Sequence, residues 1–520
     1  GALPNLPKVQ SADLTIAAPY VLTNPLTVSG TLTVSGTGTQ LDFNGQRLQV
    51  GDMTLGSGTT MRMVNPADTL IAGTGQQAFA LTTSSAATLS GLLTAGTIIM
   101  RGGLNGGTPF VASGTHRVVF SDSGLVAAAR TFDWAGAGTF RAVRMSGTNQ
   151  LTVRFTSAPL VNDTLLISTP MVMTFNAGHV PRINGPFLTV AGSTVNVGTT
   201  SAVLELGHSS GTTGIAGDFI GGNGTVRFLT AAPVQPTRTG LTYNALDFRA
   251  SPTFTGAVTM TGDLVASGPG TVVDLAGQTV SVGDGLSISA PAALVMSSAA
   301  STLTVNGTNA GSFTIGTGAH TLTAGTLRLR TNTISWNGLS TTSPVFRVVV
   351  DGTTGATPQT SSSPLRVGVL RIEGTRGLTT GGWDVTVNDS LVVAPGLTFG
   401  FTGGTFDVGG VLLTGTTSTL SAGNLVLRDT SSLNQVAGSA SMTTLTFANG
   451  TLPQRLPTAA RFTYGNVNVP AGTSVTVDAG TARVGAGTTG TLTVDGTLTI
   501  PDGSTCLLYT SPSPRDYCAH

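Results

Sequence analysis

Short runs in which apolar and hydroxyl residues alternate constrain this chain more than any other feature. The runs "LTVSGTLTV" (26–34), "TVSVGDGLSI" (279–288) and "TLTVDGTLTI" (491–500) largely alternate Val, Leu or Ile with Thr or Ser. A period of two places the apolar side chains on one face of a strand. The runs break at Gly, Asn-Gly or Asp-Gly, which suit tight turns with positive φ. The pattern predicts an all-β chain of short, half-buried strands.

The composition agrees with this prediction. Only 9% of the 520 residues are charged, against about 25% in ordinary soluble domains. Lys8 is the single lysine, and Glu205 and Glu373 are the only glutamates. Because Lys, Glu and Ala favour helices whereas Thr, Val and Ile favour sheets, a helical bundle is excluded and a doubly wound α/β enzyme is disfavoured.

The charge pattern also limits the partners. The net charge is +1 and no run of Lys or Arg occurs, so the clustered cations that bind nucleic acid are missing. No apolar stretch reaches the ~18–20 residues of a membrane-spanning helix. We therefore predict neither a nucleic-acid partner nor a membrane-spanning segment in this chain.

An internal repeat organises the sequence. Leu26–Asp52 aligns without gaps onto Val258–Asp284, and the alignment matches five glycines and two aspartates. A second marker, L-[TS]-A-G-x-[IL]-x-[ML]-R, occurs at Leu93–Arg101, Leu322–Arg330 and Leu420–Arg428. Aromatic residues followed by apolar alternation recur at intervals of slightly more than one hundred residues, at Phe140, Tyr243, Phe346 and Phe462. These markers predict diverged repeat units of about one hundred residues.

The predicted organisation follows from these markers. It comprises an N-terminal extended segment or cap at 1–19, repeat units at 20–139, 140–240, 241–345 and 346–461, a truncated unit at 462–505, and a non-native tail at 506–520. The unit at 140–240 is the most diverged.

Two all-β architectures fit the pattern. In a parallel β-solenoid, each coil of about 20–25 residues adds one turn along an axis, giving roughly 20–24 turns. In the alternative, each unit is a separate antiparallel β-sandwich. Short dense strands, few aromatic residues and stacked Thr and Ser favour the solenoid, whereas the length of the unit favours the sandwich. We predict the solenoid.

The segments "LTVSGTLTVSGTGTQLDFNGQ", "LTAGTIIMRGG" and "FVASGTHRVVF" resemble the long Gly/Thr/Val-rich repeat regions of bacterial surface proteins, some of which carry Ig-like domains. They are also similar to passenger regions of autotransporter-type adhesins. The resemblance is one of pattern and covers nearly all of residues 20–505. It implies an exported, elongated, non-catalytic stalk or adhesin, and it carries over no site residues.

The last residues have a different character. Residues 506–516, "CLLYTSPSPRD", resemble the translation of a transposase sequencing adapter of the kind found in metagenomic reading frames. We therefore expect 506–520 to be non-native, and the natural protein to continue beyond residue 505. Both cysteines, Cys506 and Cys518, fall in this tail, so the sequence supports no disulfide and no cysteine-metal site.

Two glycine-rich motifs suggest chemistry and fail on their context. Gly207–Gly211 fits G-x-S-x-G, but the residues that follow cannot form the helix of a nucleophile elbow. Gly485–Gly490 fits G-x-G-x-x-G, but a strand follows it, so no helix N-terminus is available for a pyrophosphate. We predict no catalytic and no cofactor-binding residues.

Metal sites also lack support. The four histidines of the body do not form a zinc-binding spacing; they are His116, His179, His208 and His320. His116 and His320 both follow a turn, in "SGTH" and "TGAH". Aspartates at turns, such as Asp351 and Asp495, could contact calcium, yet no calcium-binding loop motif occurs. We therefore predict no metal site and no cofactor.

Paired carboxylates would indicate a polysaccharide lyase or glycosidase. Asp384 with Asp389 is one candidate pair. Asp42 with Asp52 is another, and it recurs in the second copy as Asp274 and Asp284. Recurrence in repeats favours a structural role for these residues.

The sequence therefore predicts a non-catalytic structural or adhesive repeat protein, secreted or on the cell surface. Its partner would be an extracellular surface, a polysaccharide or a second copy of itself. A carbohydrate-active β-helix enzyme and a self-assembling filament or matrix subunit remain as alternatives.

Overall fold

The structure is a computed structural model of the chain. It describes residues 9–10, 12–74, 79–84, 87, 89–106, 110–123, 125, 130–135, 138–147, 151–176, 178–198, 202–307, 313–331, 333–335, 339–352, 359–361, 364–375, 377–380, 382–413, 415–428, 438–448, 454–485, 490–508 and 517–518.

Parallel strands stack as a β-solenoid of about 19 turns, and the described residues form no helix. The predicted fold class is thereby confirmed. Antiparallel sandwiches were the wrong alternative, because neighbouring strands pair in parallel from β1 (Val9–Gln10) with β4 (Leu26–Val34) onwards. Among the described strand pairs the exception is β55 (Thr505–Leu508) with β56 (Tyr517–Cys518). The hundred-residue repeat units remain a prediction.

The number of turns is slightly below the expected 20–24. Most turns take 20–25 residues; Arg47, for example, lies opposite Thr69 in the next turn. Some turns are longer: Leu104 lies opposite Trp134, 30 positions later. A chain of fixed length with several long turns therefore makes fewer of them.

The contacts divide the chain into two compact units, residues 1–262 and 263–520. In the first unit, two sides of the solenoid carry β1, β2 (Leu14–Ile16), β4, β6 (Arg47–Leu55), β8 (Thr69–Ala72), β9 (Leu81–Thr83), β10 (Thr97–Met100), β11 (Leu104–Gly106), β12 (Arg117–Ser121), β13 (Arg130–Trp134), β15 (Ala142–Ser146), β16 (Leu151–Phe155), β18 (Leu165–Ile167), β19 (Val172–Phe175), β21 (Phe187–Leu188), β22 (Thr194–Val197), β24 (Asp218–Ile220) and β27 (Leu241–Thr242). Its other strands are β3 (Tyr20–Val21), β5 (Gln40–Asp42), β7 (Thr60–Arg62), β14 (Thr139–Phe140), β17 (Leu160–Val161), β20 (Arg182–Ile183), β23 (Val203–Leu206), β25 (Thr225–Phe228), β26 (Ala232–Val234), β28 (Ala245–Phe248), β29 (Pro252–Phe254) and β30 (Val258–Met260).

The second unit starts with strands of two to six residues, continues with several of eight to sixteen residues and ends with strands of two to four residues. The shorter strands are β31 (Leu264–Ala266), β32 (Val272–Asp274), β33 (Thr279–Val282), β34 (Leu286–Ile288), β35 (Ala293–Met296), β36 (Thr302–Val305), β37 (Phe313–Ile315), β38 (Thr321–Leu322), β39 (Thr326–Leu329), β40 (Thr333–Ser335), β41 (Arg347–Gly352), β42 (Gln359–Ser361) and β44 (Leu378–Thr380). The remaining strands are β43 (Leu365–Gly374), β45 (Val385–Val393), β46 (Thr398–Leu413), β47 (Thr419–Leu427), β48 (Ser439–Phe447), β49 (Gln454–Leu456), β50 (Phe462–Val469), β51 (Ser474–Val477), β52 (Thr481–Val484), β53 (Leu492–Val494), β54 (Thr497–Thr499), β55 and β56.

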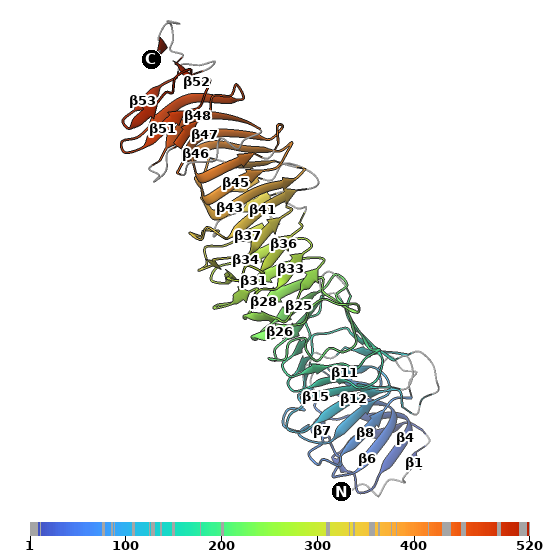
Figure 1. The fold of residues 1–520 in the computed structure, drawn as a ribbon. Coiled ribbons are helices and arrows are strands. Elements are labelled where there is room, and N and C mark those ends of the chain that lie inside the picture. Colours follow the sequence, from blue (N-terminus) through green and yellow to red (C-terminus); the bar gives the residue numbers. More distant parts are fainter. Residues whose placement is uncertain are drawn as a thin grey trace. The chain divides into compact units, whose positions relative to one another are not determined.

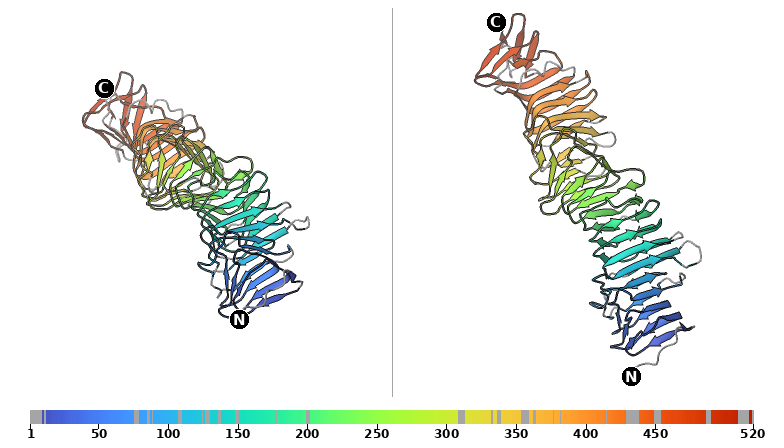
Figure 2. Two further views of the ribbon diagram at one scale, coloured as in Figure 1. Left: turned by 90° about the horizontal axis from the view of Figure 1, so that it is seen from below. Right: turned by 60° about the horizontal axis from the view of Figure 1, so that its bottom comes forward.

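A turn of the solenoid has three sides. In the second unit, β31, β34 and β37 pair along one side, β32, β35 and β38 along another, and β33, β36 and β39 along the third. Figure 1 shows β31 and β34 on one side and β33 and β36 on the other, and in Figure 2 the strands of successive turns run in the same direction.

The alternation seen in the sequence separates the core from the surface. Inward positions stack at one register from turn to turn, so that an apolar column forms inside the solenoid. In the first unit one column contains Trp134, Phe155 and Phe175, whose rings lie 4.8 and 4.6 Å apart. In the second unit, one column of stacked inward residues is aliphatic. It contains Leu303, Leu327, Val348, Leu370, Leu391 and Val411.

Candidate functional site

Several charged side chains contact an opposite charge in a neighbouring turn. Glu205, Arg227 and Asp247 occupy one register on β23, β25 and β28. Arg227 lies 2.9 Å from the Glu205 carboxylate and 2.7 Å from that of Asp247. Arg249 adds a contact of 2.9 Å to Asp247, whose side chain is only 7% exposed. This ladder ties three successive turns of the first unit together.

The second unit contains a ladder of the same kind. The Asp351 carboxylate contacts Arg328 and lies 2.9 Å from Arg330, both of which belong to the turn before it. Glu373 in the turn after it lies 2.6 Å from Arg371 and 3.6 Å from Arg328. Both glutamates of the chain therefore take part in contacts that stack the turns.

The carboxylates of Asp42 and Asp52, which the sequence nominated as a pair, have different surroundings, and Oδ1 of Asp52 is buried without a hydrogen-bond partner among the described residues. The Asp42 carboxylate accepts hydrogen bonds from Arg62 at 2.6 Å and from the Asn44 amide at 3.0 Å. Burial, and then the charge of Asp13, raise the pKa of Asp52, so its electrostatic neighbour is Asp13 and not Asp42. This arrangement offers no acid–base pair of Asp42 with Asp52.

Asp384 and Asp389 are likewise engaged separately. The Asp384 carboxylate accepts a hydrogen bond from the Thr405 amide at 2.6 Å, whereas Asp389 accepts one from the hydroxyl of Ser390 at 3.0 Å. Asp274 accepts a bond from the Ala276 amide at 2.9 Å, and its repeat partner Asp42 binds the Asn44 amide in the same way. Asp42 and Asp274, which recur in the two copies, therefore hold turns.

The G-x-S-x-G segment has no helix after it. β23 ends at Leu206, and residues 209–214 form successive turns. His208 Nδ1 lies 2.9 Å from the hydroxyl of Ser210, while Ser209, the central serine of the motif, is exposed. The helix that would complete a nucleophile elbow is replaced by turns. In the other motif, Gly485–Gly490, residues 486–489 lie outside the described residues.

The two histidines that follow a turn differ in their surroundings. His116 is fully buried beside Phe110, at 6.3 Å between ring centroids, and neither ring nitrogen has a hydrogen-bond partner among the described residues. Burial lowers the pKa of His116 to about 4, so the ring is neutral near pH 7. His320 instead accepts a bond from the Leu294 amide at 2.9 Å and lies 2.8 Å from the carbonyl of Gly316.

His179 contributes its backbone carbonyl, which accepts a hydrogen bond from the Val203 amide of the next turn. Across the described part of the chain, no group of three or more His, Cys, Asp or Glu side chains lies close enough to hold a metal ion. Of the predicted non-native tail, residues 509–516 and 519–520 lie outside the described residues. The segment Thr505–Leu508 forms β55 and pairs with β52.

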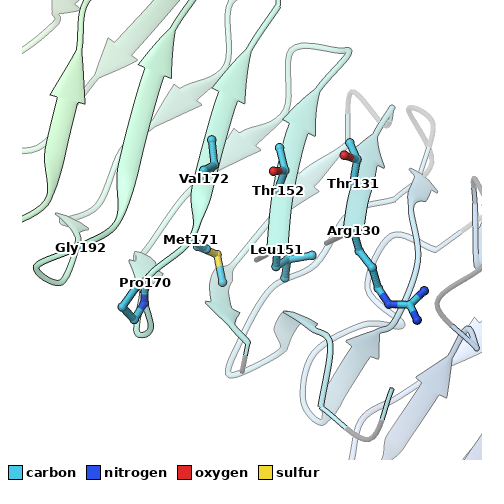
Figure 3. Close-up of a pocket in the computed structure, with 8 residues that line it drawn as sticks. All are labelled: Arg130, Thr131, Leu151, Thr152, Pro170, Met171, Val172 and Gly192. Atoms are coloured by element: carbon cyan, nitrogen blue, oxygen red, sulfur yellow. The ribbon is translucent and has the colours of Figure 1, made fainter. Parts of the chain in front are cut away.

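Two shallow grooves mark the surface of the first unit. The first, of about 390 Å³, crosses β13, β16 and β19, and Figure 3 shows Thr131, Thr152 and Val172 at one register along it. The second, of about 360 Å³, crosses β10, β12 and β15. We call it the arginine groove, and its lining residues are Thr97, Ile99, Arg101, Arg117, Val119, Ser121, Ser123, Arg144 and Ser146.

The arginine groove has an apolar floor between polar rims. Ile99 and Val119 are register partners on neighbouring strands, and Arg144 follows at the same register one turn later. Arg117 lies at one side of this floor, and Arg101 with Ser121 lies at the other. No Asp or Glu occurs among the described residues that line either groove.

Sequence reasoning missed this groove. Its arginines are 16 and 27 positions apart along the chain. They come together because successive turns stack, and the number of residues in a turn varies, so their spacing in the sequence does not reveal the contact. One signal was present: Arg101 closes the first copy of the marker L-[TS]-A-G-x-[IL]-x-[ML]-R.

No described segment forms a helix of the length and apolarity needed to cross a membrane. Comparison with known proteins gives no match: no family model, no curated protein and no solved structure matches the chain.

Proposed function

We propose that this chain is a non-catalytic structural or adhesive protein that acts outside the cell and presents the surface of its solenoid to a partner. One observation carries the proposal. Both glutamates and seven aspartates form ion pairs with arginines, mostly across neighbouring turns. A carboxylate held by an arginine is a poor general acid or base, because the cation stabilises its charged form.

The surface chemistry supports the same role. Threonines stack at one register outside the core, as Thr279, Thr302 and Thr326 do on β33, β36 and β39. Such a surface is uncharged and repetitive, and each turn depends on its neighbours for its core. These properties suit a protein that extends and presents a surface, and the resemblance to bacterial surface repeats points the same way.

Two measurements test the proposal. The purified chain is incubated at high concentration with neutral and acidic polysaccharides, and new reducing ends and unsaturated sugar products are measured. We expect neither above the background. Product release that disappears on Asp→Asn substitution would overturn the non-catalytic role.

The location is tested separately. Antibodies against the solenoid are applied to intact producing cells and to lysed cells. We expect equal labelling of both; labelling that requires lysis would overturn the extracellular role. Size-exclusion chromatography with light scattering on the same sample distinguishes a monomer from the self-assembling alternative.

A further inference from the structure

Three copies of one sequence marker end in arginine, and they differ in what that arginine contacts. Arg428 forms a two-pronged ion pair with Asp407, with both bonds at 2.6 Å. Arg330 binds Asp351 through Nε at 3.0 Å. Arg101 has no ion-pair partner among the described residues, and its Nε is buried without a hydrogen-bond acceptor. The repeat position that binds a carboxylate twice in the second unit therefore lacks one in the first.

Two arginines that line the same groove as Arg101 add positive charge without a paired carboxylate in the described part of the chain. Arg117 and Arg144 line the same groove, and neither forms an ion pair with a described residue. Arg144 donates through Nε to the hydroxyl of Ser168 at 3.0 Å, which leaves its terminal amino groups available. Burial, and then the charge of Arg47, lower the pKa of Arg101, as expected for a cation without a counter-charge.

The acidic residue nearest to the groove in the sequence, Asp122, is not one of its lining residues. Asp122 follows Ser121 in the sequence but is 1% exposed, and its carboxylate lies against Gly147 at the next corner. The described lining of the arginine groove thus carries three arginines and no carboxylate.

We propose that the arginine groove binds a linear acidic polysaccharide, with its anionic groups on the three arginines. The arginines belong to three successive turns, which are about 4.8 Å apart along the axis, and they lie at three different positions across the strands, so that they surround the apolar floor. Guanidinium groups bind carboxylate or sulfate oxygens in pairs. Ser123 and Ser146 supply partners for sugar hydroxyls, and Ile99 and Val119 form an apolar floor for the C–H face of a ring. This inference rests on the adhesive role proposed above and names its ligand class.

Binding is tested with the full chain by microscale thermophoresis or calorimetry. The probes are polygalacturonate, its fully methyl-esterified neutral form, and dextran sulfate. We expect polygalacturonate to bind with an affinity that falls as salt rises, and the neutral form not to bind. Tighter binding of dextran sulfate would identify sulfate as the preferred anion within the same class. Equal binding of the neutral and acidic forms would overturn the proposal.

Substitutions localise the effect. The double variant Arg117→Gln/Arg144→Gln removes two exposed cations, and we expect about tenfold weaker binding or more, since each lost charge pair costs several-fold in affinity. Arg101→Gln is a second, independent variant with the same expected direction. The matched control is Arg154→Gln, because Arg154 lies in the same unit and is already bound to Asp133 at 2.7 Å. Unchanged binding in the groove variants, or equal loss in the control, would contradict the assignment.

A folding control and a competition experiment complete the test. Melting curves and circular dichroism must match the unmodified chain, so that loss of binding is not loss of folding. If single-stranded DNA competes equally well at the same arginines, the groove is a general polyanion site and the polysaccharide proposal fails. Absence of binding would overturn this inference alone, whereas product release or an intracellular location would overturn the proposed role without altering the binding result.

Discussion

The turn at residues 43–46 in the first unit and the turn at 275–278 in the second have the same backbone conformation and differ in the groups that support them. Asn44 and Ala276 have φ of 46° and 47°, and the glycines that follow them have φ of 79° and 85°. In both turns, the fourth amide donates to the first carbonyl at 2.8 Å. Two successive positive φ values and this bond define a type I′ turn.

The groups that support these turns from the next coil are different. In the first unit the Asp68 carboxylate accepts the amides of Gly45 and Asn65, at 2.5 and 2.8 Å. In the second, the hydroxyl of Ser301 accepts the amide of Gly277 at 3.0 Å. The comparison teaches that this corner requires a hydrogen-bond acceptor and not a charge. Acidic residues at turns therefore serve the fold, which is why their recurrence does not indicate a catalytic site.

The largest expected effect is at Asp68, which is fully buried. Asp68→Ala removes the charged acceptor of two partly buried hydrogen bonds, from the amides of Gly45 and Asn65, and we expect a loss of about 3 kcal/mol in the free energy of unfolding of the first unit. Ser301→Ala removes one neutral bond and should cost about 1 kcal/mol. Urea unfolding followed by circular dichroism, with hydrogen exchange at Gly45 and Gly277, measures both.

A second variant sharpens the same point. Asp68→Ser supplies the hydroxyl that the second unit uses, and it should recover part of the lost stability. If Asp68→Ser were as unstable as Asp68→Ala, the negative charge itself would be required and the comparison would break.

The buried histidine gives an effect of nearly the same size. Because the pKa of His116 is about 4 in the folded chain and near 6.5 when unfolded, only the unfolded chain binds the proton between these values. Stability is therefore greatest above about pH 6.5 and falls by roughly 3 kcal/mol as the pH drops to about 4. His116→Leu should remove this pH dependence, and unfolding curves at pH 4.5 and 7.5 test it. The same slope in both proteins would show that other groups cause it.

The matched change at the other histidine has the opposite consequence. His320 makes two hydrogen bonds, to the Leu294 amide and the Gly316 carbonyl. His320→Leu should destabilise the second unit by about 2 kcal/mol at pH 7, whereas His116→Leu at the same pH loses no hydrogen bond to a described residue. Thermal melts at pH 7 compare the two variants; equal losses would mean that both histidines act only by packing.

The smallest effect concerns the turns themselves. Alanine at φ 47° is strained, and asparagine tolerates this conformation better. Ala276→Asn should stabilise the second unit by about 1 kcal/mol, and Asn44→Ala should destabilise the first by slightly more, since Asn44 also donates to the carbonyl of Leu22 at 3.3 Å. Chemical unfolding of both variants checks the sign, and a destabilising Ala276→Asn would contradict the assigned turn.

The features that could be predicted from the sequence depend on residues close together in the chain. Alternation identified the strands, and Asn44-Gly45 marked a tight turn, because both signals are contained within a few residues. The ion-pair ladders and the arginine groove were not predictable, since their residues are one or more turns apart and turn length varies. Arg227 meets Asp247 after 20 residues, whereas Arg328 meets Asp351 after 23. The burial of His116 was hidden for the same reason, because "SGTH" and "TGAH" look alike locally.

Oxidative cross-linking tests most directly that successive turns stack in parallel and in register. Thr302 and Thr326 are register partners on β36 and β39, and parallel neighbours about 4.8 Å apart can form a disulfide. In a Cys506→Ser/Cys518→Ser background, Thr302→Cys/Thr326→Cys should cross-link nearly completely under mild oxidation. Thr302→Cys/Arg328→Cys, displaced by two residues, should not. Failure of the first pair, or equal cross-linking of both, would contradict the solenoid.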